Sequence, residues 1–515
     1  MDVLTLFSFL LATPTTIFSF LSQLYLWQIK EYRWDRMRAS LVDRPLSQVL
    51  LLLYFAYALT LIAWLLALPF LSLIAIGLFC SLYVWRAFSL GIYRPQWTTK
   101  ARLIGLMEAV YLLLLYTLVV LSNHDQAIKL SILIVSILPL TALCVGLVNL
   151  LTQPLKQRTI ARSRALRQSL DQLTVVGVTG SYGKTTTKHI LSHLIPSAIV
   201  SLEHRNSVYV IALDMLKQLT TTTKLYIVEM SAYRPGEIAD LAALTKPAVG
   251  VITHLGNQHL ALFRSMPRLV QTKWELISAL PKDGIAVLNA DDPEQVAQAK
   301  FFKGLTRWYS ISRPADVYAD QISIQSDEIN FRLHLSSHSF PVSLPLLSEA
   351  YLSSVLAAVA TASAVGLSAD DIVSRLSSIT PYPRTMELVA GRSGASIVDD
   401  SYSANEQSVL NAIRHLQRFP QTDRRIIMVP LIELGGSSQA VHRRLGQALK
   451  KSGAQVFVYG KAWHHELNQP HFTNPDLIIK LACQNITGNT VILLEGRIPE
   501  TIRRALTNTD TNSSE

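Results

Sequence analysis

Residues 175–187 read Val175-Val-Gly-Val-Thr-Gly-Ser-Tyr-Gly-Lys-Thr-Thr-Thr187. An apolar run typical of a buried strand passes through a glycine turn into a run that predicts a helix. A phosphate loop requires this order, because glycines let backbone N–H groups converge on phosphate while the helix N-terminus adds its positive dipole end. The predicted loop consists of Thr179, Gly180, Ser181, Tyr182, Gly183, Lys184, Thr185 and Thr186.

Two side chains of this loop have predicted roles of their own. Lys184 can reach the β- and γ-phosphates of a nucleotide, and the Thr185 hydroxyl can bind Mg²⁺. The eight-residue form of the pattern wants glycine at position 178, which is Val178 here, so the match is to the shorter form that starts at Gly180. ATP and Mg²⁺ are therefore the predicted cofactors. A chance glycine turn after a strand is the alternative, and the strand-to-helix context disfavours it.

On both sides of the loop, short apolar runs alternate with amphipathic stretches, which predicts an α/β domain with a parallel sheet. We expect strands at 174–178, 224–229, 248–253 and 285–288, and helices at 186–194, 236–244 and 268–280. Residues 316–345 alternate like short strands and predict an antiparallel flap, followed by an alanine-rich helix at 350–365. This P-loop domain is predicted to occupy residues 173–383.

A second unit is predicted after the proline-bearing connection at Tyr382-Pro-Arg384. Its apolar runs at 396–399, 425–430, 455–459 and 490–494 again alternate with helical stretches, so a Rossmann-like α/β domain is expected at 384–506. The polar stretch 507–515 predicts a disordered tail.

The residues before 156 have a different character. The chain is 50% hydrophobic, with a mean hydropathy of +0.28, and most of the excess lies here. A membrane-crossing helix needs about 20 apolar residues to cover roughly 30 Å of hydrocarbon. Runs at 3–29, 47–85, 103–123 and 130–155 meet that length, and the second reads as two helices that turn near Pro69. A five-span transmembrane domain is therefore predicted at 1–155, with a basic linker at 156–172.

The basic residues predict how these spans are oriented. Lysines and arginines gather after the first, third and fifth spans, which places the N-terminus outside and everything after the fifth span in the cytoplasm. The expected location is the cytoplasmic membrane. The net charge of +11 is met by lipid head groups there, so no nucleic-acid partner is expected. Three isolated cysteines, Cys80, Cys144 and Cys483, imply a reduced cytoplasmic body.

Several segments, taken in order, resemble the Mur ligase family, which joins amino acids or peptides to carboxylates of cell-wall precursors. They run collinearly from Val175 to Gly496. After the loop they are Glu229-Met-Ser231, Pro235-Gly-Glu-Ile238, Thr253-His-Leu-Gly-Asn-Gln-His-Leu260, Gln271-Thr-Lys-Trp-Glu275, Asn289-Ala-Asp-Asp-Pro293, Asp399-Asp-Ser-Tyr-Ser-Ala-Asn405, and Leu434-Gly435 followed by His442.

The resemblance implies a role for each matching residue. Glu229 and His259 would hold Mg²⁺, and Lys273 would be a carbamylated lysine that bridges a second Mg²⁺. Asn289 would face adenine, while Arg384, Asp400 and Asn405 would contact nucleotide or substrate when the last domain closes. The implied reaction is ATP-dependent amide formation through an acyl phosphate, with Lys184, His259 and Lys273 as the catalytic residues. The implied amine is an amino acid or a dipeptide such as D-alanyl-D-alanine.

Simpler interpretations exist for three of these side chains. Glu229 could be a solvated carboxylate at a strand end, His259 a surface or core histidine, and Lys273 part of the wet face of an amphipathic helix. The family's UDP-sugar-binding N-terminal domain has no counterpart here, and the predicted five-span segment occupies its place. An acceptor that is lipid-linked, or at least presented at the lipid bilayer, is therefore expected.

Two other functions compete with the ligase. A nucleotide-binding membrane scaffold that has lost ligation is favoured by Ala350, Tyr351 and Ser354, which stand where the family usually has a His-Asn pair and a further Asn. A transport ATPase is disfavoured, because few charges lie inside the apolar runs. The retained Lys184, Glu229, His259 and Lys273 favour catalysis.

Overall fold

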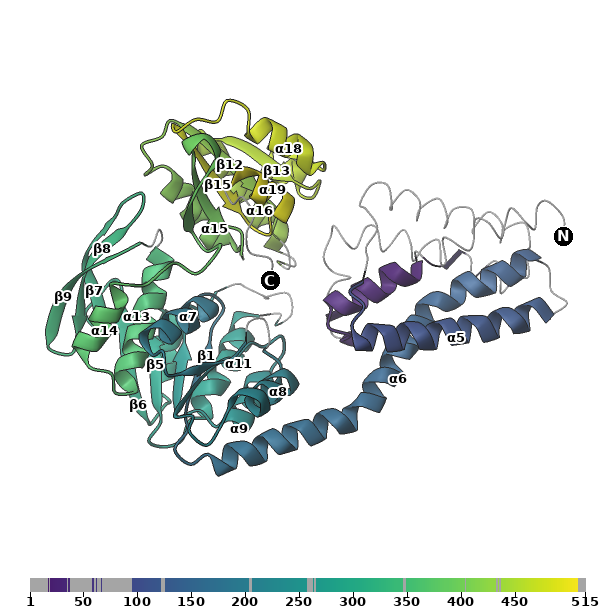
Figure 1. Cartoon of the computed structure of the whole chain (residues 1–515), viewed down its shortest axis with the longest axis horizontal. Coiled ribbons are helices and arrows are strands. Elements are labelled where there is room, and N and C mark those ends of the chain that lie inside the picture. Colours follow the sequence, from purple (N-terminus) through teal and green to yellow (C-terminus); the bar gives the residue numbers. More distant parts are fainter. Residues whose placement is uncertain are drawn as a thin grey trace. The chain divides into compact units, whose positions relative to one another are not determined.

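The computed structural model describes most of the chain after residue 95. Besides isolated positions before that residue, the described ranges are 19–34, 36–37, 95–121, 126–202, 206–256, 263, 265–345, 349–402, 404–431, 434 and 437–507. The chain divides into two compact units, residues 1–158 and 159–515 (Figure 1). Each is considered by itself.

The first unit is helical where it is described. Its two long helices are α5 (Thr99–Leu121) and α6 (Gln126–Ser169), and α6 continues past the end of the unit. Ile104 of α5 and Val145 and Val148 of α6 are buried in a common cluster with Leu24 and Trp27. Other apolar side chains of these helices face outward, among them Leu106, Leu113, Leu114, Leu150 and Leu151.

The membrane prediction receives no support from these helices. In the described part of the chain, no helix combines the length and the apolar character that crossing a bilayer requires. The expected spans at 3–29 and 47–85 lie largely outside the described residues, whereas that at 103–123 is described up to residue 121 and that at 130–155 is described throughout, as part of α6. The five-span domain therefore stays a prediction from sequence.

The second unit begins with a nine-stranded sheet (Figure 1). In spatial order its strands are β2 (Ile199–Val200), β3 (Leu225–Glu229), β1 (Thr174–Thr179), β4 (Val249–Ile252), β5 (Ile285–Asn289), β6 (Leu305–Ser310), β7 (Val317–Ile324), β8 (Ile329–Leu335) and β9 (His338–Leu344). β1 pairs in parallel with β3 and β4, so it is central, and both faces of it are buried. That burial explains why β1 reads as a continuous apolar run.

Helices cover both faces of this sheet. They are α7 (Lys184–Leu194), α8 (Val208–Gln218), α9 (Glu237–Thr245), α11 (Met266–Ser278), α12 (Pro293–Ala299), α13 (Glu349–Ala364) and α14 (Ala369–Leu376). Alternate residues of β1 point to opposite faces: Val176 and Val178 pack with α7, α13 and α14, whereas Val175 packs with α8, α9 and α11. The predicted strands and helices of this region are confirmed to within a few residues.

The expected antiparallel flap is part of this same sheet. β7 pairs in parallel with β6 through Tyr309 and Ser310, and β8 and β9 then add antiparallel strands. The sheet is therefore mixed, where a parallel sheet with an antiparallel flap was predicted.

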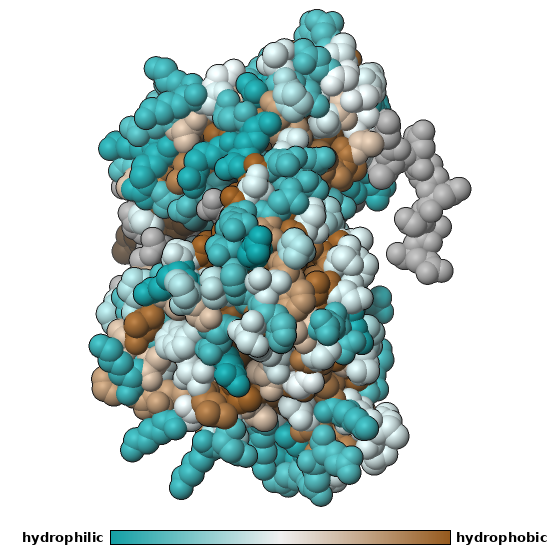
Figure 2. All heavy atoms as spheres, turned by 90° about the vertical axis from the view of Figure 1, so that its left-hand side faces the viewer, coloured by the Kyte–Doolittle hydropathy of each residue, from teal (hydrophilic) through white to brown (hydrophobic). Residues whose placement is uncertain are grey.

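Hydrophilic and hydrophobic side chains are interspersed on the side of the molecule that Figure 2 shows.

A second, six-stranded sheet follows. In spatial order its strands are β10 (Glu387–Ala390), β11 (Ser396–Asp400), β15 (Thr490–Glu495), β12 (Asp423–Met428), β13 (Gln455–Tyr459) and β14 (His471–Phe472), all parallel except β10. Its helices are α15 (Glu406–Leu416), α16 (Ser438–Lys451), α17 (His464–Leu467), α18 (Pro475–Ala482) and α19 (Glu500–Leu506), with a short 3₁₀ turn, η1 (Arg392–Gly394). The predicted second α/β unit is confirmed.

Candidate active site

The predicted phosphate loop joins β1 to α7 as expected. β1 ends at Thr179, and α7 begins at Lys184. Gly180 and Gly183 have φ angles of +149° and +81°, a region that side chains with a Cβ rarely adopt. Gly183 is the N-cap of α7 and provides no side-chain cap. The amides at the start of α7 are therefore left for a ligand, as an anion site requires.

Two loop amides are already engaged. The N–H groups of Ser181 and Tyr182 both donate to the carbonyl oxygen of His254, at 2.8 and 3.3 Å. Thr253 fixes the same segment, because its hydroxyl donates to the carbonyl oxygens of Thr179 (3.1 Å) and Tyr182 (2.5 Å). The segment after β4 thus sets the loop's shape, and a phosphate bound here would meet the amides that begin α7.

Lys184 lies across the loop. Its Nζ donates to the carbonyl oxygens of Gly180 (2.9 Å) and Ser181 (3.1 Å). Burial lowers the pKa of this ammonium, and the carboxylate of Glu229 opposes that shift. A flexible side chain held by two neutral carbonyls can move to a phosphate, because a charge-assisted bond to phosphate is the stronger interaction.

Thr185 and Glu229 meet where β3 ends. Thr185 Oγ1 donates to Glu229 Oε2 at 3.1 Å, and Asn206 Nδ2 lies 3.3 Å from Glu229 Oε1. Glu229 is only 5% exposed, so it is not the solvated carboxylate of the simpler interpretation. The parallel pairing of β1 with β3 brings the two residues together, since it places the carboxyl ends of both strands at one edge of the sheet.

Sequence reasoning missed Lys188, Asn206 and Ser201 at this site. Lys188 Nζ lies 3.4 Å from Glu229 Oε2 and donates to the Ser201 carbonyl oxygen at 3.0 Å. Ser201 Oγ accepts the N–H of Glu229 at 3.1 Å. The one available signal was the position of Lys188, one helical turn after Lys184 on the phosphate-loop helix.

Lys273 is buried in α11, with 3% of its surface exposed. The wet-face interpretation is therefore wrong. Burial is the largest cause that lowers the pKa of Lys273 to about 7; the Lys184 ammonium adds to the shift, and the carboxylates of Glu237, Glu229 and Glu275 oppose it. A buried lysine amine that is partly neutral near physiological pH is a nucleophile.

Glu275 has a structural task that the sequence did not reveal. Its carboxylate accepts the N–H groups of Gly236 (2.7 Å) and Ala239 (3.0 Å) and so caps the start of α9. The Pro235–Ile238 and Gln271–Glu275 segments, read separately in the sequence, therefore form one structural unit that fixes α11 beside α9.

For two other residues predicted in this domain, His259 and Asn289, the structure does not test the expected role. His259 lies outside the described residues. Asn289, at the end of β5, is buried, and its Oδ1 accepts the N–H of Asp291 at 2.9 Å. That side chain therefore shapes the turn after β5, and its expected role facing adenine remains a prediction.

In the second domain, Arg384 and Asp400 come together. Asp400 Oδ1 accepts the N–H of Met386 at 3.1 Å, and the carbonyl oxygen of Arg384 accepts the N–H of Tyr402 at 2.9 Å. Burial is the main cause that raises the pKa of Asp400 to about 7. The Arg384 guanidinium pairs with Glu500 at 2.7 Å.

Asn405 is placed differently. Its Oδ1 accepts the N–H of Ser408 at 2.9 Å, and Ser408 Oγ in turn accepts the N–H of Asn405, which together form a capping box on α15. Its side-chain oxygen is thus committed to the helix, and the expected substrate contact remains a prediction.

The residues present fit a magnesium ion only in part. Within the described ranges, no three His, Cys, Asp or Glu side chains stand close enough together to hold a metal ion. Thr185 and Glu229 nevertheless offer a hydroxyl and a buried carboxylate side by side, which are the hard oxygen ligands that Mg²⁺ prefers. Because Mg²⁺ normally keeps several waters and adds substrate phosphates, two protein oxygens suffice.

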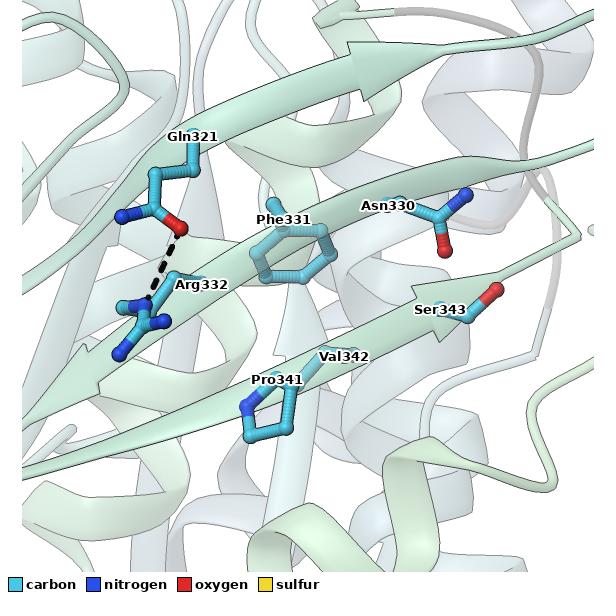
Figure 3. Close-up of a pocket in the computed structure, with 7 residues that line it drawn as sticks. All are labelled: Gln321, Asn330, Phe331, Arg332, Pro341, Val342 and Ser343. Atoms are coloured by element: carbon cyan, nitrogen blue, oxygen red, sulfur yellow. Dashed lines mark hydrogen bonds between the residues drawn. The ribbon is translucent and has the colours of Figure 1, made fainter.

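A separate hollow lies on β7, β8 and β9 (Figure 3). Its volume is about 340 Å³, and its lining includes Phe331, Pro341 and Val342, with Arg332 Nε donating to Gln321 Oε1 at 3.3 Å. None of the predicted site residues lines it, so it is distinct from the phosphate-loop site.

The loop geometry predicts that Gly183→Ala weakens ATP binding by about tenfold or more. The new methyl group would lie 2.8 Å from Ser354 Oγ at a φ of +81°, so the Ser354 side chain must turn away and the loop backbone is strained. Gly236→Ala is the matched control: Gly236 is also a helix N-cap, at φ +90°, but nothing lies within 4 Å of its added Cβ. Calorimetric titration with ATP and Mg²⁺ measures both variants, and equal affinities would contradict the loop assignment.

Curated proteins of known function are similar to this chain. UDP-N-acetylmuramoyl-tripeptide–D-alanyl-D-alanine ligase of Mycobacterium tuberculosis is 31% identical over 311 residues, which is 57% of this chain and 60% of the relative. The Escherichia coli K12 protein of the same name is 29% identical over 296 residues, covering 56% of this chain and 65% of the relative. The chain thus spans less than two thirds of the length of these curated relatives.

Solved structures and family patterns agree with these relatives. The crystal structure of a MurF ligase from Thermotoga maritima in complex with ADP superposes with a TM-score of 0.63 at 25% identity, covering 68% of this chain and 84% of that one. The Mur ligase middle domain matches residues 178–362, and the Mur ligase glutamate ligase domain matches residues 385–498. Through these two domains, the chain belongs to the Mur ligase family.

Proposed function

We propose that this protein is an ATP-dependent ligase that forms an amide bond on the carboxylate of a peptidoglycan precursor. One observation carries the proposal: the uncapped start of α7 meets the buried Glu229 carboxylate through Thr185, beside Lys184. Family membership supports it, since both matched domains are those of Mur ligases.

The proposed chemistry has two steps. The acceptor carboxylate attacks the γ-phosphorus of ATP, so that a carboxyl oxygen–phosphorus bond forms and ADP leaves. The amine then attacks the acyl carbon, an amide bond forms, and inorganic phosphate leaves with the carboxyl oxygen. Both steps bring anionic oxygens together, and cations must offset the repulsion.

The residues of the site divide this work. The amides that begin α7 bind the β- and γ-phosphates, and Lys184 moves from the loop carbonyls to the phosphate oxygens. Thr185 and Glu229 would hold Mg²⁺, which offsets phosphate charge. Lys273 is buried, and the charges of Lys184 and Glu229 act on its pKa; carbamylated, it would contribute a further anionic ligand.

The substrates are inferred from the names of the relatives. Those proteins are ligases for UDP-N-acetylmuramoyl-tripeptide and D-alanyl-D-alanine. We therefore propose a muramoyl-peptide carboxylate as the acceptor and D-alanyl-D-alanine as the amine donor. The apolar runs before residue 156 favour an acceptor that is lipid-linked or presented at the membrane surface.

Lys184→Ala is expected to lower the rate of ADP formation by at least about a hundredfold, because developing charge on the transferred phosphoryl group loses its cation. The assay uses the detergent-solubilised full chain with ATP, Mg²⁺, D-alanyl-D-alanine and either the UDP-linked or the lipid-linked precursor, and detects the product by mass. Lys217→Met, on the exposed side of α8, is the control. Full activity in Lys184→Ala would refute the site.

The same assay separates the competing functions. Wild-type ADP formation should require both acceptor and amine. Nucleotide binding without turnover would instead support the scaffold that has lost ligation, and acceptor-independent hydrolysis would support a transport ATPase. Equal turnover of both precursors would remove the argument for a lipid-linked acceptor.

Carbamylation of Lys273 should follow pH. A pKa of about 7 means that the amine becomes neutral as pH rises through 7, and only the neutral amine attacks CO₂ to form an N–C bond and release a proton. With ¹³C-labelled bicarbonate, a carbamate signal should be strong at pH 8 and weak at pH 6. Lys273→Met should remove it, and exposed Lys282→Met should not. A signal unchanged in Lys273→Met would exclude this lysine.

We further propose that the chain is attached to the cytoplasmic membrane with its two α/β domains in the cytoplasm. The proposal rests on the long uncharged runs of the first 155 residues and on the basic stretch that follows them. The full chain should stay with membranes washed in alkaline carbonate and be released by detergent. Release by carbonate alone would contradict this attachment.

A further inference from the structure

We propose that Lys188 is a positioning residue that serves as the resident counter-ion of Glu229 and keeps this carboxylate aimed at Thr185 while no metal is bound. The inference rests on the proposed function, because it assumes that Thr185 and Glu229 are the ligands of Mg²⁺. It concerns a residue that neither the phosphate-loop pattern nor the resemblance assigned.

Lys188 reaches Glu229 because of its spacing from Thr185 along α7. Lys188 lies three residues after Thr185 on α7, so both side chains project from the same face of the helix. Thr185 Oγ1 and Lys188 Nζ both approach the same atom, Glu229 Oε2, at 3.1 and 3.4 Å. One carboxylate oxygen is thus shared by the expected metal ligand and a cation.

Ser201 fixes both partners of the ion pair. Its carbonyl oxygen accepts from Lys188 Nζ at 3.0 Å, and its hydroxyl accepts the N–H of Glu229 at 3.1 Å. Ser201 is 1% exposed and follows β2, the neighbour of β3 in the sheet. Lys188 therefore has a second anchor that does not depend on Glu229, and it can stay in place when the carboxylate turns to a metal.

Because the ion pair of Lys188 and Glu229 is buried, losing one of its charges should affect stability. Lys188 and Glu229 are 4% and 5% exposed, and theirs is the one ion pair that Glu229 forms within the described part of the chain. A buried carboxylate without a partner is strongly destabilising, whereas removing both charges together is often tolerated. A metal site that must empty and refill needs a cation that compensates the carboxylate between cycles.

Three variants of the full chain test this role by thermal unfolding, with and without saturating Mg²⁺ and ATP. Without ligand, Lys188→Met should melt several degrees below wild type, because Glu229 loses its counter-ion. Adding Glu229→Gln to Lys188→Met should restore most of that loss. Lys188→Arg should stay close to wild type. Lys217→Met, an exposed lysine on α8, is the control for loss of charge.

The ligand arm distinguishes this inference from the proposed function. Mg²⁺ with ATP should raise the melting temperature of Lys188→Met more than that of wild type, because the metal replaces the missing cation. If wild type shows no ligand-induced shift, the proposed function fails, and the comparison without ligand still decides the role of Lys188.

Two results would overturn the inference. One is a Lys188→Met variant as stable as wild type without ligand. The other is a double variant that is no more stable than Lys188→Met, since that outcome would mean that Lys188 only fills space. A Lys188→Met chain that does not fold leaves the double variant to decide, because the account expects the double variant to fold.

Discussion

The Glu229 carboxylate, buried where β3 ends, is the group on which the arrangement of the site depends. It can be approached by the phosphate-loop helix only because β1 and β3 are parallel neighbours whose carboxyl ends share one edge of the sheet. Thr185 bonds to it from the first turn of α7, and Asn206 approaches it from the segment before α8. The strand–loop–helix connection would thus place a nucleotide's phosphates beside a charged oxygen ligand.

The loop also depends on the next strand. The carbonyl oxygen of His254 accepts two loop amides, and Thr253 bonds to two loop carbonyls. The substitution of Gly180 would bring a Cβ to 2.0 Å from Thr253 Oγ1, so the loop and the end of β4 have no space between them. The proposed phosphate site is therefore built on three adjacent strands, β3, β1 and β4. The connection at Tyr382-Pro-Arg384 joins the two domains, since the Tyr382 ring contacts both His189 of α7 and Tyr402 after β11.

The sequence predicted the features of the site that depend on local signals, and it missed those that depend on contacts between distant segments. The loop, β1 and α7 were predictable because glycine positions and apolar runs are local signals. The burial of Lys273 and the ion pair of Lys188 were not, because they depend on which segments meet in space. Asn405 matched a motif, yet its side chain caps α15. The strands at 316–345 were found, but not their continuity with the main sheet, because strand pairing is non-local. His259 and most of the runs at 3–29 and 47–85 lie outside the described residues, and no described helix combines the length and apolar character of a membrane span, so those predictions stay predictions from sequence.

The central claim is that this site lets ATP phosphorylate a carboxylate before an amine attacks. Oxygen tracing tests it most directly, because the leaving phosphate must take one oxygen from the acceptor. The full chain would be incubated with ATP, Mg²⁺, amine donor and a muramoyl-peptide acceptor whose terminal carboxylate carries ¹⁸O. The account predicts inorganic phosphate with one ¹⁸O atom for each amide formed. Amide formation with phosphate free of the label would contradict it.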